Sequence, residues 1–236
     1  MIEPFHVLVP AGNDETFSAD ATDRPAPSCD AQSPNLDRLH ADIVACRACE
    51  RAGHIAEARP IRHPWTPAQR TMIVGQAPGA LTHAQRYHFA GPGGALLERW
   101  FERAGFAPGT WRDRCYITSM TRCFPGKSPR GNGDRRPSTP ELALCRPFLE
   151  AELRLVRPRL IVPVGSIAID YVLGRYGLGR RPLNAVVGRA FELDGRMVLP
   201  LPHPSGVSRW LNAPAHRELV ERAIGHLRDL RLTLDL

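Results

Sequence analysis

The sequence predicts an α/β fold in three layers, α/β/α, in which helices cover both faces of a central four-stranded parallel sheet. Two observations lead to this prediction. Short apolar runs that end at glycine or proline alternate along the chain with longer segments of helical periodicity. Segments rich in glycine, proline and histidine directly follow the apolar runs. Because ligands of open parallel sheets bind beyond the carboxyl ends of the strands, a functional site is expected there.

Four apolar runs carry the strand prediction. Two of them read TMIVG and LIVPVG, as is typical of strands buried on both faces. The predicted strands are residues 71–75, 115–120, 160–165 and 197–201. Apolar residues at helical spacing predict the helices, which are residues 35–48, 95–104, 141–156 and 213–232.

The length of 236 residues fits a single domain with an extension. Residues 1–35 are polar and proline-rich without sustained periodicity, which predicts a flexible or loosely docked N-terminal extension. Residues 36–236 are predicted to form the domain. Residues 1–37 hold seven acids and one arginine, so this segment carries about −6 and the rest of the chain about +13.

The basic charge is almost entirely arginine, since Lys127 is the only lysine. Guanidinium groups suit planar, two-point contact with phosphate. The charge therefore favours a phosphate-rich partner such as nucleic acid.

Nothing in the sequence resembles a secretory signal or a membrane span. The first apolar stretch, residues 7–11, is short and is followed by Asp14 and Glu15, and no run approaches the length that crosses a bilayer. We therefore predict an intracellular, cytoplasmic protein without membrane contact, in a reducing compartment that favours thiolate ligands over disulfides.

Four cysteines predict a metal or iron-sulfur site closed across the fold. Cys46 and Cys49 form a C-x-x-C pair, whereas Cys123 and Cys145 lie far downstream. Only the first pair is local, so tertiary structure must gather the ligands. Cys29 is expected in the extension, and Cys115 in the core. A zinc site is the alternative, and the brown colour of an iron-sulfur protein would distinguish it.

Three further segments can carry chemistry. The first, GQAPG at residues 75–79, predicts a sharp turn that lets backbone approach a ligand. The second, FAGPGG at residues 89–94, leads into a helix start. In the third, residues 201–212, His203 stands between two prolines that fix its backbone, which favours an aimed imidazole over a packing role.

Together these segments resemble the uracil-DNA glycosylase superfamily, most closely its family-4 iron-sulfur branch, over roughly residues 40–225. Six motifs occur in the family's order: CRAC, GQAPG, HFAGPGG, ITSMTRCFPGK, RPSTPELALCRPFL and PHPS. The resemblance implies removal of uracil from DNA in base excision repair, with the nucleotide flipped into a pocket and free uracil released. It also implies a nucleoid-associated protein that acts as a monomer on single- or double-stranded DNA.

The resemblance also assigns residues. Phe89 looks like the aromatic that stacks on uracil, and His203 like the donor to uracil O2. The loop backbone implied to form the pocket floor comprises Gly75, Gln76, Ala77 and Gly79. The resemblance implies that Ser119 reads the edge of the base, and Asn212 is the alternative residue for this role. The segment implied to contact DNA comprises Ser205, Ser208, Arg209, Trp210 and Leu211. A structural 4Fe-4S cluster would be held by Cys46, Cys49, Cys123 and Cys145.

The chain also departs from the family pattern. Gln76 replaces a glutamate, so no carboxylate in this loop can activate water, and Ser119 replaces an asparagine. The substitutes for water activation are His83, Gln85 and His88. An inserted RGNGDRR segment is either a DNA-contacting loop or a solvated linker. Two alternatives to turnover stay open: covalent capture of uracil-DNA through a loop histidine, and a catalytically silent DNA-binding module.

Overall fold

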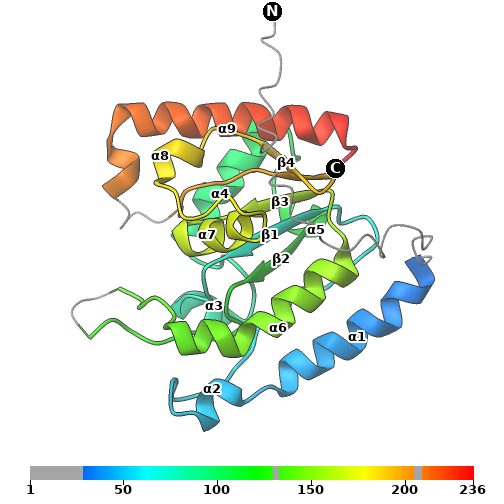
Figure 1. The fold of residues 1–236 in the computed structure, drawn as a ribbon, viewed down its shortest axis with the longest axis vertical. Coiled ribbons are helices and arrows are strands. Elements are labelled where there is room, and N and C mark those ends of the chain that lie inside the picture. The colour runs from blue at the N-terminus through cyan, green and yellow to red at the C-terminus, as the bar shows by residue number, and fades with distance from the viewer. Residues whose placement is uncertain (1–28, 130–132, 205–208) are drawn as a thin grey trace, which may run out of the picture.

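In this computed structural model the described residues are 29–129, 133–204 and 209–236. Their centre is a five-stranded sheet with the strand order β2-β1-β3-β5-β4 (Figure 1). Strands β1, β2, β3 and β5 are parallel, and β4 pairs antiparallel with β5. The strands are β1 (Thr71–Gly75), β2 (Cys115–Ser119), β3 (Leu160–Pro163), β4 (Phe191–Leu193) and β5 (Arg196–Val198).

Helices cover both faces of the sheet. Figure 1 shows α1 and α6 side by side on one side of the sheet and α9 across the opposite side. The helices are α1 (Cys29–Ala45), α2 (Ala48–Arg51), α3 (Ala80–Gln85), α4 (Pro92–Arg103), α5 (Trp111–Arg114), α6 (Thr139–Val156), α7 (Ser166–Gly174), α8 (Leu183–Val186) and α9 (Pro214–Thr233), with the 3-10 helix η1 (Arg209–Asn212).

Alternation along the strands divides the core into two layers. On β1, Met72 and Val74 pack with Leu149 of α6, whereas Ile73 between them packs with Leu227 of α9. Every residue of β1, β2 and β3 is buried. The predicted α/β/α fold with a parallel sheet is therefore confirmed.

The sheet differs from the prediction in one strand. Residues 191–193 form β4, which extends the predicted four strands to five. A strand of three residues is too short to show periodicity. The turn to β5 is Asp194-Gly195, both with positive φ, and this dipeptide is a hairpin signal that the sequence prediction overlooked.

The N-terminal boundary also moves. Helix α1 begins at Cys29 and ends at Ala45, so it starts inside the range predicted as extension. The pair of cysteines follows directly, with Cys49 in the short helix α2. Residues 1–28 lie outside the described part of the chain, and the extension stays a prediction. Within the described residues, no helix combines the length and apolarity needed to span a membrane.

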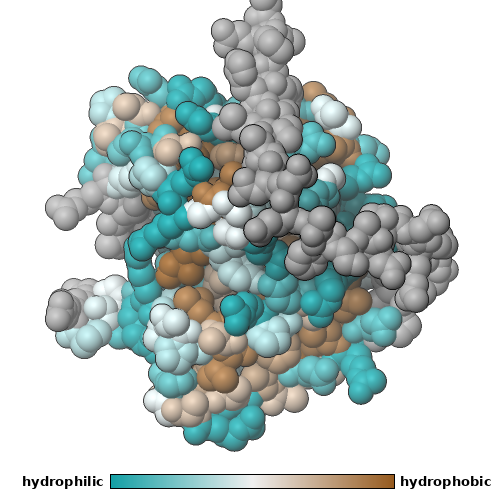
Figure 2. All heavy atoms as spheres, viewed as in Figure 1, coloured by the Kyte–Doolittle hydropathy of each residue, from teal (hydrophilic) through white to brown (hydrophobic). Residues whose placement is uncertain are grey.

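The surface mixes apolar and polar residues. Figure 2 shows apolar residues gathered over the part of this face where α1, α2 and α6 run. Val44 and Leu144 are among the large apolar side chains that stay exposed. The sheet itself is covered, so any site must open at the strand ends or at the sheet edges.

A buried polar network joins α6 to β2. The guanidinium of Arg122 donates to the Glu152 carboxylate, and each side chain is 2% exposed. Two strand residues also donate to Glu152: Thr118 Oγ1 at 2.7 Å and Tyr116 Oη at 3.0 Å. Ring nitrogen Nε2 of His40 on α1 lies 2.9 Å from the Tyr116 hydroxyl. One carboxylate thus ties two helices to the edge strand.

Replacement of Glu152 by alanine should lower the free energy of unfolding by about 3–5 kcal/mol, because it leaves the buried Arg122 charge without its partner. Unfolding in urea, followed by circular dichroism, measures the change. Glu192→Ala on β4 is the control, since Glu192 is exposed and its loss should change stability by less than about 0.5 kcal/mol. Similar small changes for both variants would contradict a stabilising role for the network.

Candidate functional site

The predicted site residues come together at the carboxyl ends of the parallel strands. The GQAPG loop follows β1, Ser119 ends β2, and His203 follows β5. Backbone contacts close the gaps between these loops, since Met120 N donates to Gly75 O at 2.9 Å and Gly165 N donates to Leu201 O at 2.9 Å. The topology therefore brings these three segments to the same edge of the sheet.

Phe89 packs against the end of β1. A Cβ on Gly75 would lie 3.4 Å from the ring tip of Phe89 and 3.7 Å from Cβ of Ser119. Any side chain at position 75 would therefore fill the space in front of the Phe89 ring. Because position 75 is a glycine, the Phe89 ring and the Ser119 side chain both lie close to the bare backbone at the end of β1.

The backbone of Phe89 is held in an unusual conformation. Its φ is +55°, a left-handed value that non-glycine residues rarely adopt. Nη2 of Arg112 donates to Phe89 O at 3.1 Å. A Cβ on Gly94 would lie 1.7 Å from the same oxygen, so only glycine allows α4 to start there. Specific contacts therefore hold this strained backbone in place.

Ser119 is buried, and its hydroxyl proton is already used. Ser119 Oγ donates to Thr121 O at 2.6 Å, and the Arg122 guanidinium donates to Ser119 O. The lone pairs of Oγ remain free to accept a hydrogen bond from a ligand. The buried network therefore fixes this hydroxyl as an acceptor.

His203 lies where the last loop crosses β3 and α4. A Cβ on Gly165, whose φ is +86°, would lie 3.3 Å from Cδ2 of His203. A Cβ on Gly93 would lie 3.0 Å from Pro204 O, so the loop also abuts the start of α4. While His203 stays exposed overall, partial desolvation of the ring and the positive charge of Arg136 lower its pKa below the ordinary value. The imidazole is therefore neutral at neutral pH.

The loop after β1 carries a contact that the sequence analysis missed. Oδ2 of Asp134 accepts the backbone N–H of Ala80 at 2.9 Å, and Oδ1 lies 2.8 Å from Nζ of Lys127. A Cβ on Gly79 would lie 2.9 Å from Oδ2, so a side chain there would displace this carboxylate. Gln76 and Ala77, half-buried, precede this anchor in the same loop.

Asp134 belongs to the inserted segment. The described residues at the base of this insertion are 126–129 and 133–136. Lys127 and Asp134 form an antiparallel bridge, and Arg135 N donates to Gly126 O at 3.0 Å. The Arg135 guanidinium donates to Glu141 at 2.7 and 2.8 Å and to His54 O at 2.9 Å. The insertion is therefore anchored to the loop after β1 and to α6 through these contacts, while its contact with DNA stays a prediction.

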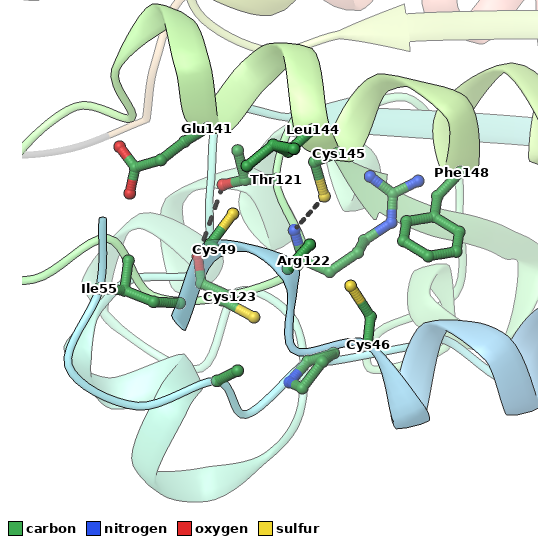
Figure 3. Close-up of a pocket in the computed structure, with 13 residues that line it drawn as sticks. Cys46, Cys49, Ile55, Thr121, Arg122, Cys123, Glu141, Leu144, Cys145 and Phe148 are labelled. Carbon is green, nitrogen blue, oxygen red and sulfur yellow. Dashed lines mark hydrogen bonds between the residues drawn. The ribbon is translucent and has the colours of Figure 1, made fainter. Parts of the chain in front are cut away.

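Four cysteines face one cavity. Figure 3 shows the thiols of Cys46, Cys49, Cys123 and Cys145 pointing toward a common space. The residues come from the end of α1, from α2, from the loop after β2 and from α6. The backbone N–H of Arg122 donates to Cys145 Sγ at 3.2 Å. The lining also includes apolar side chains, such as Ile55, Leu144 and Phe148, and the carboxylate residue Glu141.

The protonation of these thiols reflects their surroundings. Burial and the nearby Cys145 raise the pKa of Cys49 to about 11 and that of Cys123 to about 12. Among the described residues, no group of three or more histidine, cysteine or acidic side chains is compact enough for one metal ion. The four thiols, the apolar side chains beside them and the amide donor are the kind of surroundings that suit a thiolate-bound metal or iron-sulfur group.

The segment after His203 is only partly described. Ser205 and Ser208 lie outside the described residues. Trp210 stacks on His216 with ring centroids 4.2 Å apart, and with Leu211 it packs against the core beside α9. Asn212 is exposed at the end of η1. In this structure, Trp210 and Leu211 serve as packing residues, and Arg209 begins the 3-10 helix.

The candidate loop histidines lie apart from His203. His83 Nε2 is 3.7 Å from the Glu57 carboxylate, and its ring lies 5.6 Å from that of Phe124. His88 is buried beside His63, and burial lowers its pKa to about 3. Gln85 is exposed at the end of α3. None of these contacts brings a histidine to the Phe89 ring.

Comparison with known proteins points to one family. The family model described as the uracil DNA glycosylase superfamily matches residues 65–227. The Type-4 uracil-DNA glycosylase of Sulfurisphaera tokodaii is 24% identical over 203 residues, covering 84% of this chain and 86% of that protein. The Archaeoglobus fulgidus Type-4 enzyme is 26% identical, covering 82% and 93%. The Type-5 uracil-DNA glycosylase of Mycobacterium leprae is 30% identical, covering 72% and 85%.

The match and the geometry agree. The matched range contains Phe89, Ser119 and His203, which the fold gathers at the strand ends, while Cys46 and Cys49 precede it. Since the family model covers more than half of the sequence, the chain belongs to the uracil-DNA glycosylase superfamily.

Proposed function

We propose that this protein is a uracil-DNA glycosylase, a hydrolase that flips uracil out of DNA and cleaves its N-glycosidic bond. The products are free uracil and an abasic site, which places the reaction in base excision repair. The observation that carries the proposal is the convergence of Gly75, Phe89, Ser119 and His203 at the strand ends. The similarity to Type-4 and Type-5 uracil-DNA glycosylases supports the same reaction.

Recognition of the base follows from the groups in the pocket. The Phe89 ring offers a stacking face, and the bare backbone at Gly75 leaves space for a flat ring. The Ser119 hydroxyl, which already donates to Thr121 O, accepts a hydrogen bond. Uracil carries an N–H at position N3, whereas cytosine carries an acceptor there. An acceptor-only serine therefore favours uracil over cytosine.

Bond cleavage moves charge onto the base. The C1′–N1 bond breaks, its electron pair leaves with uracil and spreads to O2, and the sugar gains oxocarbenium character. A neutral His203 donates its N–H to O2 as this charge develops. A donor that acts mainly in the transition state raises the rate more than the affinity. Water then adds to C1′ and loses a proton to solvent or to a nearby base.

Asp134 is proposed as a positioning residue for the loop after β1. Its Oδ2 holds Ala80 N, four residues beyond Gln76. The Ala80 amide and Nζ of Lys127 already occupy the two carboxylate oxygens. The carboxylate therefore keeps the pocket floor in place rather than removing a proton from water.

A 4Fe-4S cluster is proposed as the cofactor. Cys46, Cys49, Cys123 and Cys145 would hold it, and when bound it would act as a structural cross-link between the N-terminal helices and the end of β2. Arg122 links this cysteine group to the pocket, because its backbone N–H meets Cys145 and its side chain meets Ser119 O.

The setting of the reaction is also proposed. The protein acts as an intracellular monomer on DNA, with residues 36–236 as the catalytic domain and residues 1–35 as an acidic extension. The Arg209 segment after His203 is proposed to contact the DNA backbone. Repacking of Trp210 away from α9 would be required before it could occupy the gap left by a flipped base.

Replacement of His203 by alanine should lower the single-turnover rate of uracil excision about 10²- to 10³-fold, since one donor to a developing oxyanion is lost. Affinity for an oligonucleotide with a cleavage-resistant 2′-fluoro-deoxyuridine should change less than about threefold, because the donor acts on charge that appears during cleavage. His203→Asn keeps an N–H donor, so its excision rate should lie between the rates of the wild type and of His203→Ala. Parallel losses of rate and affinity would contradict the proposed role.

Replacement of Cys145 by serine should abolish the visible absorption of the purified protein and reduce bound iron from about four atoms per chain. The reason is the loss of one of four proposed thiolate ligands. Absorption spectra with iron and sulfide analysis measure both. Cys115→Ala is the matched control, because Cys115 is buried in the core away from the other four. Stoichiometric zinc in the wild-type protein would overturn the cluster assignment.

Replacement of Asp134 by alanine should lower kcat/KM for uracil excision by about tenfold or more, because small displacements of a reacting group are costly. Asp134→Asn keeps an oxygen acceptor for Ala80 N and should recover most of the loss. Steady-state kinetics measured across pH distinguishes a positioning role of Asp134 from a general-base role. If Asp134→Asn were as poor as Asp134→Ala and removed an acidic limb of the pH profile, the carboxylate would be the general base instead.

A further inference from the structure

A second cavity lies along the free edge of β2, outside the proposed pocket. It has a volume of about 510 Å³, within the range of small-ligand sites. We call it the edge cavity. Its walls come from the end of α1, the loop at residues 60–64, the loop between α3 and α4, and α5. The side chains that matter here are Arg62, Arg86, Tyr87, His88 and Arg112.

The edge cavity is positively charged. Arg86 donates to the carbonyl oxygens of Arg59 and Pro60 at 2.9 Å each, which position its guanidinium without neutralising it. Arg62 is exposed, and its side chain makes no hydrogen bond or ion pair with the described residues. Arg112 lies 3.6 Å from Glu98. Among the described residues of the lining, three are arginines and Asp113 is the one acidic residue, so positive charge prevails.

The same cavity offers an aromatic face. Tyr87 is 47% exposed, and the Arg112 guanidinium carbon lies 5.7 Å from its ring centroid and 4.4 Å from that of Trp111. Burial lowers the pKa of His88 to about 3, so at neutral pH the positive charge comes from the arginines. Guanidinium groups beside an exposed aromatic ring form the combination that binds nucleotides through phosphate and base.

The edge cavity is connected to the proposed pocket. Tyr87 and His88 directly precede Phe89 in the chain, and Arg112 lines the cavity while its Nη2 donates to Phe89 O at 3.1 Å. A strand whose uracil stacks on Phe89 therefore passes close to this cavity with an adjoining nucleotide.

We infer that the edge cavity binds a phosphate, together with an adjoining nucleotide, of the DNA strand that carries the uracil. This inference rests on the proposed function and extends its substrate contact to the outer edge of the sheet. Arg62 and Arg86 supply the charge and Tyr87 the stacking face. The shared chemistry is a phosphate ester, which a free nucleotide such as dUMP also carries.

Arg62→Ala tests the inference, with Arg189→Ala as the matched control. Arg189 is also an exposed arginine, and it lies two residues before β4, at the opposite edge of the sheet. Binding of a single-stranded oligonucleotide with 2′-fluoro-deoxyuridine is measured from 50 to about 200 mM salt. The slope of log affinity against log salt should fall by about 0.7 for Arg62→Ala, the value for one lost phosphate contact, and should not change for Arg189→Ala.

Two further measurements identify the molecule that supplies the bound phosphate. Trimming the oligonucleotide on one side of the uracil should remove the difference between wild type and Arg62→Ala, which locates the bound nucleotide. If dUMP binding alone depended on Arg62, a free nucleotide would be the occupant instead of the DNA strand. Equal slopes for both variants, with equal dUMP binding, would overturn the inference. Because these binding measurements need no cleavage, they test the edge cavity even if the protein fails to excise uracil. Failure of excision is detected in a separate activity assay.

Discussion

The buried ion pair between Arg122 and Glu152 is the interaction on which the site depends. It joins α6 to the end of β2, and Thr118 and Tyr116 donate to the same carboxylate. Arg122 also donates to Ser119 O through its side chain and to Cys145 Sγ through its backbone. Buried pairs add little net stability, but loss of one partner is costly. This pair therefore fixes the wall of the pocket and the cysteine group relative to each other.

Glycines set the shape of the rest of the site. Gly75, Gly94 and Gly165 stand where a Cβ would meet Phe89 or His203. At Gly75 and Gly165 the missing side chain lets the Phe89 ring and the His203 imidazole lie against backbone, and at Gly94 it leaves room for the Phe89 carbonyl. Around this centre, Asp134 secures one loop and Arg112 secures Phe89, and both act across long sequence separations. A flipped base would thus meet groups that are already positioned, which is the condition for electrostatic stabilisation of a transition state.

Much of this could be predicted from the sequence. Apolar runs and helical periodicity located the parallel strands and main helices, and the motif order located Phe89, Ser119, His203 and the cysteines. Strand β4 was too short to show a period. The Asp134 contact could not be predicted, because it joins residues 54 positions apart through a segment with no regular pattern. Similarly, only tertiary structure shows that Trp210 packs on His216 and that the end of α1, two separate loops and α5 enclose the edge cavity.

Counting turnovers on DNA that contains one uracil tests the account most directly. The protein is incubated with excess labelled oligonucleotide, one part is treated with alkali to cleave abasic sites, and another is run on a denaturing protein gel. The account predicts several abasic sites per protein molecule and no shifted protein band. A stoichiometric protein–DNA adduct would show covalent capture, and the absence of both products would show a DNA-binding module without glycosylase activity. Either result would contradict the proposed hydrolysis.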